Sequence, residues 1–324
     1  MPIVEPSSYN PPFILSNKHL QTVFPSYFRK CEVVDYEREE YIAPDGMPIL
    51  LDWSRRGSKN LMIINHGLCG YTQRHYVLST VRAFNAIGWD CLAWNYRGTG
   101  RTHTDSLQFT NNGSTEQVRW VTERAIAEYG YSKVAFCGFS MGGNICMNYL
   151  CREAETLPKE IIGAVFIGAT IDLQASAMKK KSFMVRIYEK HFVKMLDKIM
   201  IAKHDEFPDK VNIDGIENVT TMKQFDDRYT APIHGYKDAF DYWEQTSACR
   251  WLHNLNVPVL IANPLDDPFL HGLDYPFEEA KRSRFLYLET PKHGGHCGFI
   301  TPGKANEWWP IKRMQEFLLP LAEE

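Results

Sequence analysis

Seven short apolar runs are spread along the chain, bounded by Gly, Pro or Asn and separated by helical stretches. Continuous apolar strands that alternate with amphipathic segments are typical of a parallel sheet covered by helices on both faces, because a strand buried on both sides has no polar face. The runs are residues 49–53, 61–65, 91–95, 134–138, 164–168, 257–262 and 285–288. The sequence therefore predicts an α/β fold with a mostly parallel central sheet.

The alternation stops after Ile171 and resumes near Val257. The segment between them is helical and rich in charge, and it contains no run that fits a central strand. We predict a sheet domain made of residues 1–171 and 246–324, with residues 172–245 inserted as a helical cap. A chain of 324 residues can form one core with such an insertion.

One predicted helix of the cap has an apolar face and a basic face. Positions 184, 188, 192, 195 and 199 are apolar or aromatic, whereas positions 186, 190, 194 and 198 are Arg or Lys. A helix of this kind usually packs on a core with its charged face in water. Peripheral contact with a membrane through this basic helix is the alternative.

Composition excludes several classes of partner. The net charge of −3 and the lack of a basic tail argue against nucleic acid. The N-terminal residues do not fit a signal peptide, and no apolar stretch is long enough to span a bilayer. The eight cysteines are scattered, without metal-ligand spacing, so we expect a cytoplasmic protein with reduced cysteines and no metal. The sequence makes no prediction of the oligomeric state.

The strongest motif for chemistry lies between an apolar strand and an apolar helix. Gly138-Phe139-Ser140-Met141-Gly142 has the GxSxG pattern of a nucleophile elbow in the required context. Small residues two positions on either side let the backbone turn sharply and expose the serine hydroxyl. The sequence thus predicts Ser140 as a nucleophile for acyl transfer.

An acyl-transfer site also needs donors for the oxyanion. One donor is normally the backbone N–H of the residue after the nucleophile, here Met141, and the other comes from the loop after an earlier strand. The loop His66-Gly67-Leu68-Cys69-Gly70 follows such a strand, and we assign the second donor to the N–H of Leu68. His66 is expected to order this loop rather than to act as a base.

The acid and the base should follow the nucleophile in the order acid, then histidine. An acidic pair, Asp266 and Asp267, comes shortly after the run 257–262, at the strand edge where ligands bind in open α/β sheets. We prefer Asp266 as the acid and keep Asp267 as the alternative. His296, in a glycine-rich loop after the last run, is preferred over His293 as the base.

The ordered set of motifs resembles the YheT-like hydrolases of the α/β-hydrolase superfamily, which are related to abhydrolase-domain proteins. The resemblance covers nearly the whole chain. It includes residues 17–22 (NKHLQT), 66–70 (HGLCG), 95–98 (NYRG), 139–144 (FSMGGN), 225–226 (FD), 266–269 (DDPF) and 294–299 (GGHCGF). The resemblance implies the α/β-hydrolase fold and a triad of Ser140, Asp266 and His296. It also implies esterase-like activity, with lipid or acylglycerol substrates in some relatives.

Together these features predict a serine hydrolase that cleaves carboxylic esters, short-chain or lipid, through an acyl-serine intermediate and without a cofactor. A thioesterase or an acyltransferase would use the same triad, because the shape of the pocket selects the acceptor. A noncatalytic binding protein with this fold is the alternative from another class. We treat the HLQT, NYRG and FD segments as structural.

Overall fold

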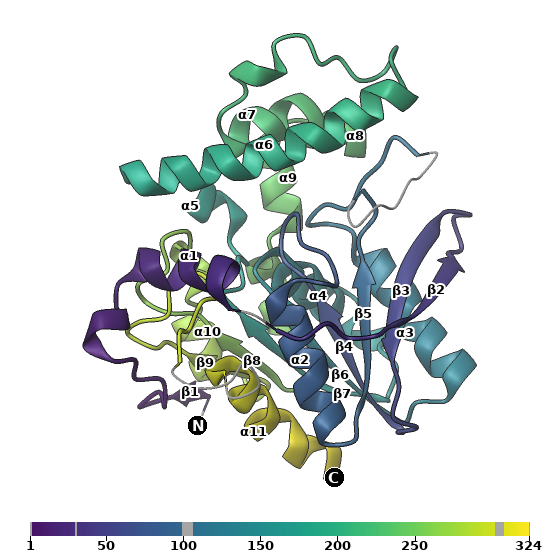
Figure 1. Ribbon diagram of the computed structural model, residues 1–324, viewed down its shortest axis with the longest axis vertical. Coiled ribbons are helices and arrows are strands. Elements are labelled where there is room, and N and C mark those ends of the chain that lie inside the picture. The colour runs from purple at the N-terminus through teal and green to yellow at the C-terminus, as the bar shows by residue number, and fades with distance from the viewer. Residues whose placement is uncertain (1, 30, 99–105, 302–307, 324) are drawn as a thin grey trace.

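The computed structural model of the protein describes all residues except 1, 30, 99–105, 302–307 and 324. Its centre is a nine-stranded sheet with the strand order β1-β9-β8-β7-β6-β4-β5-β3-β2 (Figure 1). The strands are β1 (Ile3–Val4), β2 (Glu37–Ile42), β3 (Pro48–Ser54), β4 (Asn60–Asn65), β5 (Asp90–Asn95), β6 (Lys133–Phe139), β7 (Ile161–Ile167), β8 (Val259–Ala262) and β9 (Leu286–Glu289). All neighbours pair in parallel except β2 with β3 and β3 with β5.

All seven predicted apolar runs are strands of this sheet, so the predicted α/β class is confirmed. Strand β2 was missed because its sequence, EREEYI, is polar and largely exposed. It lies at one edge of the sheet, where a strand needs no apolar run to be buried.

Two apolar layers cover the two faces of the sheet. Along β4, Leu61 and Ile63 pack in the layer that includes α3 and α4, whereas Met62 and Ile64 pack in the layer that includes α2 and α11. This alternation follows from the two-residue period of a strand. The helices of the core are α1 (Lys18–Phe28), α2 (His75–Ala86), α3 (Thr115–Tyr129), α4 (Met141–Arg152), α10 (Phe277–Arg282) and α11 (Trp309–Glu323).

A helical segment is inserted between β7 and β8 and lies above the sheet domain in Figure 1. It contains α5 (Leu173–Met178), α6 (Phe183–Glu206), α7 (Met222–Phe225), a π-helical turn η4 (Asp226–Thr230), α8 (Ala231–His234) and α9 (Ala239–Thr246). Its apolar cluster, which includes Val193, Leu196 and Phe225, also takes in Phe109 of the sheet domain. The insertion lies where the sequence analysis expects the cap, and the bounds 172–245 stay a prediction.

Among the described residues, no helix combines the length and the apolar character that crossing a membrane would require. The longest helix is α6, with 24 residues, and charged side chains occur along its whole length.

Candidate active site

Ser140 lies at the turn between β6 and α4. Its backbone has φ 52° and ψ −120°, an unfavourable region for a residue with a side chain. The turn is closed by its glycines: a Cβ on Gly142 would collide with the carbonyl oxygens of Asn65 and His66, and one on Gly138 would lie 2.7 Å from the Gly143 backbone. The first turn of α4 can therefore pack directly against the end of β4.

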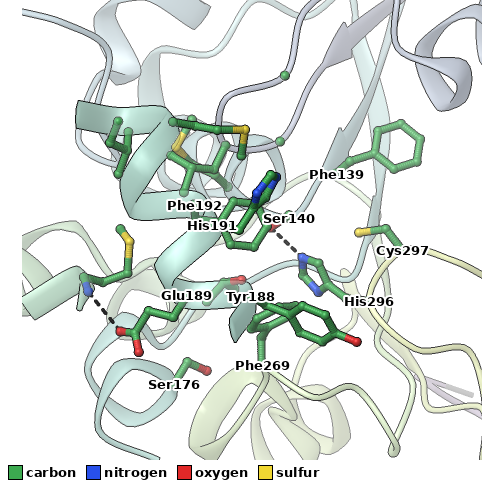
Figure 2. A pocket seen from close by; sticks show the side chains of 18 of the residues that line it. Phe139, Ser140, Ser176, Tyr188, Glu189, His191, Phe192, Phe269, His296 and Cys297 are labelled. Carbon is green, nitrogen blue, oxygen red and sulfur yellow. Dashed lines mark hydrogen bonds between the residues drawn. The ribbon is translucent and has the colours of Figure 1, made fainter. Parts of the chain in front are cut away.

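Ser140, His296 and Asp267 form a continuous hydrogen-bonded chain. Ser140 Oγ lies 2.9 Å from His296 Nε2, and His296 Nδ1 lies 2.8 Å from Asp267 Oδ2. Figure 2 shows the first of these bonds. Asp267 is buried, and its other oxygen accepts the N–H of Phe269 at 2.9 Å. A buried carboxylate held in this way fixes the orientation of the imidazole.

The carboxylate that bonds to His296 is that of Asp267, the alternative, rather than that of Asp266, the residue preferred from the sequence. The chain turns at Pro264 after the end of β8, and the Pro264 carbonyl accepts the N–H of Asp267. This turn directs the Asp267 side chain toward the His296 imidazole. Asp266 instead accepts the N–H of Gly295 at 3.0 Å and lies 3.4 Å from His293 Nδ1. Burial raises the pKa of the Asp266 carboxyl. Asp266 thus holds the histidine loop rather than the histidine itself.

The loop after β4 approaches the nucleophile closely. A Cβ on Gly67 would lie 3.4 Å from Ser140 Cβ, and the N–H of Gly67 donates to the hydroxyl of Tyr76 at 3.1 Å. Leu68 and Met141, the two residues expected to provide the oxyanion donors, both line the cavity that holds Ser140. Tyr76 lines the same cavity.

His66 is buried beneath this loop and bonds within it. Its Nδ1 lies 2.9 Å from the Gly67 carbonyl, and burial lowers the pKa of His66 to about 4. His66 is therefore neutral near pH 7, and the loop-ordering role expected from the sequence agrees with these contacts.

Helix α1 supports the histidine loop, a role that the sequence reasoning missed. Thr22 Oγ1 accepts the N–H of His296 at 3.0 Å, and the buried Gln21 accepts the N–H of Ile300 at 2.9 Å. A Cβ on Gly298 would collide with the Gln21 carbonyl. The HLQT segment is thus packed against the loop that carries His296, and its place in the family pattern was the only signal that could have revealed this.

A cavity of about 660 Å³ opens above Ser140, a volume in the usual range for small-molecule sites. Sheet domain and cap both contribute to its largely apolar wall. The wall includes Val23, Phe109, Phe139, Leu173, Val185, Phe192, Met195, Leu196, Phe225 and Phe269. Such a cavity can accept a hydrocarbon group beside the nucleophile.

Helix α6 turns part of its apolar face toward this cavity. Tyr188, Phe192 and Met195 line it, so these side chains are directed into the protein (Figure 2). The rings of Tyr188 and Phe192 lie 5.8 and 5.9 Å from that of Phe269, which in turn lies 4.8 Å from the His296 ring. The ring of Phe269, which follows β8, thus lies between the cap and His296.

One ion pair lies at the cap side of the cavity. Glu189 is buried and accepts bonds from Lys181 Nζ at 2.6 Å and from the N–H of Met222 at 2.9 Å. These contacts join α6 to the segment before it and to α7. Among the described residues, no group of His, Cys, Asp or Glu side chains could hold a metal ion.

Comparison with known proteins identifies the family. A family model described as "alpha/beta hydrolase fold" matches residues 60–302. The YheT protein of Escherichia coli K12, which is named as an esterase, is 31% identical over 291 residues, or 88% of this chain and 85% of that protein. The chain belongs to the α/β-hydrolase family. The resemblance to its YheT-like branch is thereby confirmed.

Other relatives of this hydrolase have lipid-related names. Phospholipase ABHD3 of Bos taurus is 25% identical over 86% of the chain and 70% of that protein. Monoacylglycerol lipase of Saccharomyces cerevisiae is 25% identical over 84% of the chain and 61% of that protein. The esterase Pf2001 of Pyrococcus furiosus superimposes with a TM-score of 0.59 at 16% identity, over 90% of this hydrolase and 96% of that chain, which shows a shared fold.

Proposed function

We propose that this protein is a serine hydrolase that cleaves carboxylic esters carrying an apolar group, with lipid or acylglycerol esters as the substrate class. The observation that carries the proposal is the hydrogen-bonded chain of Ser140, His296 and Asp267 at the base of an apolar cavity. The esterase and lipase names of the relatives support the same reaction class.

In this mechanism His296 Nε2 takes the Ser140 proton as Oγ attacks the ester carbonyl carbon. The oxyanion that forms accepts hydrogen bonds from the backbone N–H groups of Met141 and Leu68. When the intermediate collapses, the alcohol leaves with the proton from His296, and the acyl group stays on Ser140. Water, deprotonated by His296, then attacks the acyl-serine, and the acid is released as the bond to Ser140 Oγ breaks and His296 returns the proton to Oγ. Asp267 stabilises the imidazolium in both steps.

The eight free cysteines, four of them buried, suit a reducing compartment, and we include a cytoplasmic location in the proposal. The residues that touch substrate are all provided by this chain in the proposed mechanism, and no cofactor takes part.

The proposal is tested by labelling the protein with a fluorophosphonate probe and by measuring hydrolysis of nitrophenyl esters of increasing acyl length. We expect labelling at Ser140 and turnover that depends on chain length, with both lost in Ser140→Ala. A folded wild-type protein that neither reacts with the probe nor hydrolyses any ester would contradict the proposal and favour a binding protein.

A second variant tests the role of the cavity. Met195→Trp adds volume to the wall and should lower kcat/KM for long acyl chains while leaving acetate esters nearly unaffected. Ile201→Trp is the matched control, because Ile201 lies on the same helix, is 41% exposed and does not line the cavity. Equal effects of the two variants on every ester would argue against acyl binding in this cavity.

A further inference from the structure

The outer face of α1 exposes a row of apolar side chains. Leu20, Phe24 and Phe28 are spaced by four residues and therefore share one face of the helix. They are 37%, 38% and 66% exposed, and the two phenylalanine rings stack at 4.7 Å. Large apolar side chains gathered in this way mark a surface that contacts something other than water.

A second exposed apolar group lies beside the first, at the start of α6. Phe183 is 73% exposed and Met184 is 37% exposed. The two helices meet where Tyr188 Oη lies 3.2 Å from His19 Nδ1. Figure 1 shows α1 and the start of α6 on the same side of the molecule, one below the other.

Both groups border the mouth of the catalytic cavity. Tyr27 of α1 lines this cavity and is 74% exposed, and Ile187 of α6 lines it and is 45% exposed. Each helix thus contributes side chains to the cavity wall and presents apolar side chains to solvent close by.

The charge around these side chains has one sign. Residues 13–28 include Lys18 and contain no Asp or Glu, and residues 178–196 contain six Lys or Arg and a single acidic residue. That residue, Glu189, is buried and paired with Lys181. Lys180 and Arg186 are exposed. This region is therefore positive on a chain whose net charge is −3.

We propose that this surface, the docking face formed by Leu20, Phe24, Phe28, Lys180, Phe183 and Arg186, binds to an anionic lipid surface. Apolar side chains would enter the boundary between headgroups and acyl chains while the cations face anionic headgroups, as in interfacial amphipathic helices. Docking would bring the cavity mouth against the lipid layer. The role of docking in bringing lipid substrate to the cavity rests on the proposed function, whereas docking itself does not require catalysis.

Flotation with lipid vesicles tests the proposal on the full chain carrying Ser140→Ala, so that binding is measured apart from hydrolysis. We expect binding to phosphatidylcholine vesicles that contain phosphatidylserine, weaker binding to pure phosphatidylcholine, and release by salt. Lys180→Ala with Arg186→Ala should lower partitioning about 30-fold, which corresponds to about 1 kcal/mol for each basic residue. Phe24→Ala with Phe28→Ala should lower it by more than about tenfold.

Matched controls lie away from the docking face. Ile42→Ala removes a side chain that is 56% exposed on the edge strand β2, and Lys159→Ala removes an exposed cation before β7. Neither control should change partitioning. With the native Ser140 in place, all these variants should hydrolyse a short-chain soluble ester like the wild type. This measurement separates loss of docking from loss of folding or activity.

Three results would overturn the proposal. One is a wild-type protein that floats with neither kind of vesicle, and another is binding that the docking-face variants and the controls reduce equally. The third is a dimer in solution that Phe24→Ala with Phe28→Ala converts to a monomer, because the face would then be covered by a second copy of the chain.

Discussion

At the scale of single residues, two adjacent carboxylates have different surroundings. Asp267 is buried and bonds to His296, whereas Asp266 bonds to the backbone of Gly295 and lies beside His293. Their separate contacts come from the turn at Pro264, which points neighbouring side chains in different directions. Asp267 thus contacts the His296 ring, and Asp266 contacts the loop that carries His296.

This difference predicts unequal effects of the same substitution. Asp267→Asn should lower kcat by roughly 10⁴, because an amide cannot hold the imidazole in the required tautomer. Asp266→Asn should lower it by only about tenfold, since one hydrogen bond to the loop is weakened. Steady-state hydrolysis of a nitrophenyl ester measures both. A larger loss in Asp266→Asn than in Asp267→Asn would restore Asp266 as the acid.

At the scale of elements, helix α1 and the π-helical turn η4 each join parts of the chain that are distant in sequence. Helix α1 reaches the histidine loop through Thr22. In η4, Asp226 accepts bonds from Thr230 Oγ1 at 2.7 Å and from Trp243 Nε1 of α9 at 2.8 Å. Thr22 and Asp226 belong to the HLQT and FD segments, which the sequence analysis treats as structural.

For α1, the bond from His296 N–H predicts a positioning role for Thr22. Thr22→Val keeps the shape of the side chain but removes the acceptor, and kcat/KM should fall about fivefold for a bond of about 1 kcal/mol. Thr22→Ser should restore most of the activity because it keeps the hydroxyl. A Ser variant as impaired as the Val variant would indicate a packing role instead.

For η4, burial raises the pKa of Asp226 to about 7, from an ordinary value of 3.8. Between these two values the folded protein binds a proton that the unfolded chain lacks. The contribution of Asp226 to stability is therefore present at low pH and falls as pH rises to about 7, by up to about 1.4 kcal/mol per pH unit. Asp226→Asn cannot titrate, so urea unfolding should show a smaller stability advantage of wild type over variant at pH 8 than at pH 5. An advantage that does not change with pH would contradict the raised pKa.

At the scale of the whole molecule, the sheet domain and the cap build the cavity together, and no disulfide joins them. The eight cysteines of the protein are free, including Cys91, Cys137, Cys146 and Cys151 in the core. The fold therefore depends on packing of its apolar layers rather than on cross-links.

It follows that the melting temperature should be the same with and without dithiothreitol. Differential scanning fluorimetry at one protein concentration measures this directly. A melting temperature that falls in the reductant would reveal a disulfide and contradict the free state of the cysteines.

The sequence by itself determined the sheet and the position of the sharp turn that carries Ser140. The seven apolar runs could be recognised because strands buried on both faces must be apolar throughout, and Ser140 could be recognised because its turn requires glycines at fixed spacing. Edge strand β2 could not be recognised, since exposure removes the apolar pattern.

Only the tertiary structure decided between Asp266 and Asp267, and only it brought Thr22 to His296 across 274 positions of sequence. The physical reason is that the direction of a side chain after a turn, and contacts between distant segments, depend on packing of the whole chain. Local sequence patterns determine the elements, whereas the three-dimensional arrangement of those elements determines which neighbouring carboxylate reaches the base.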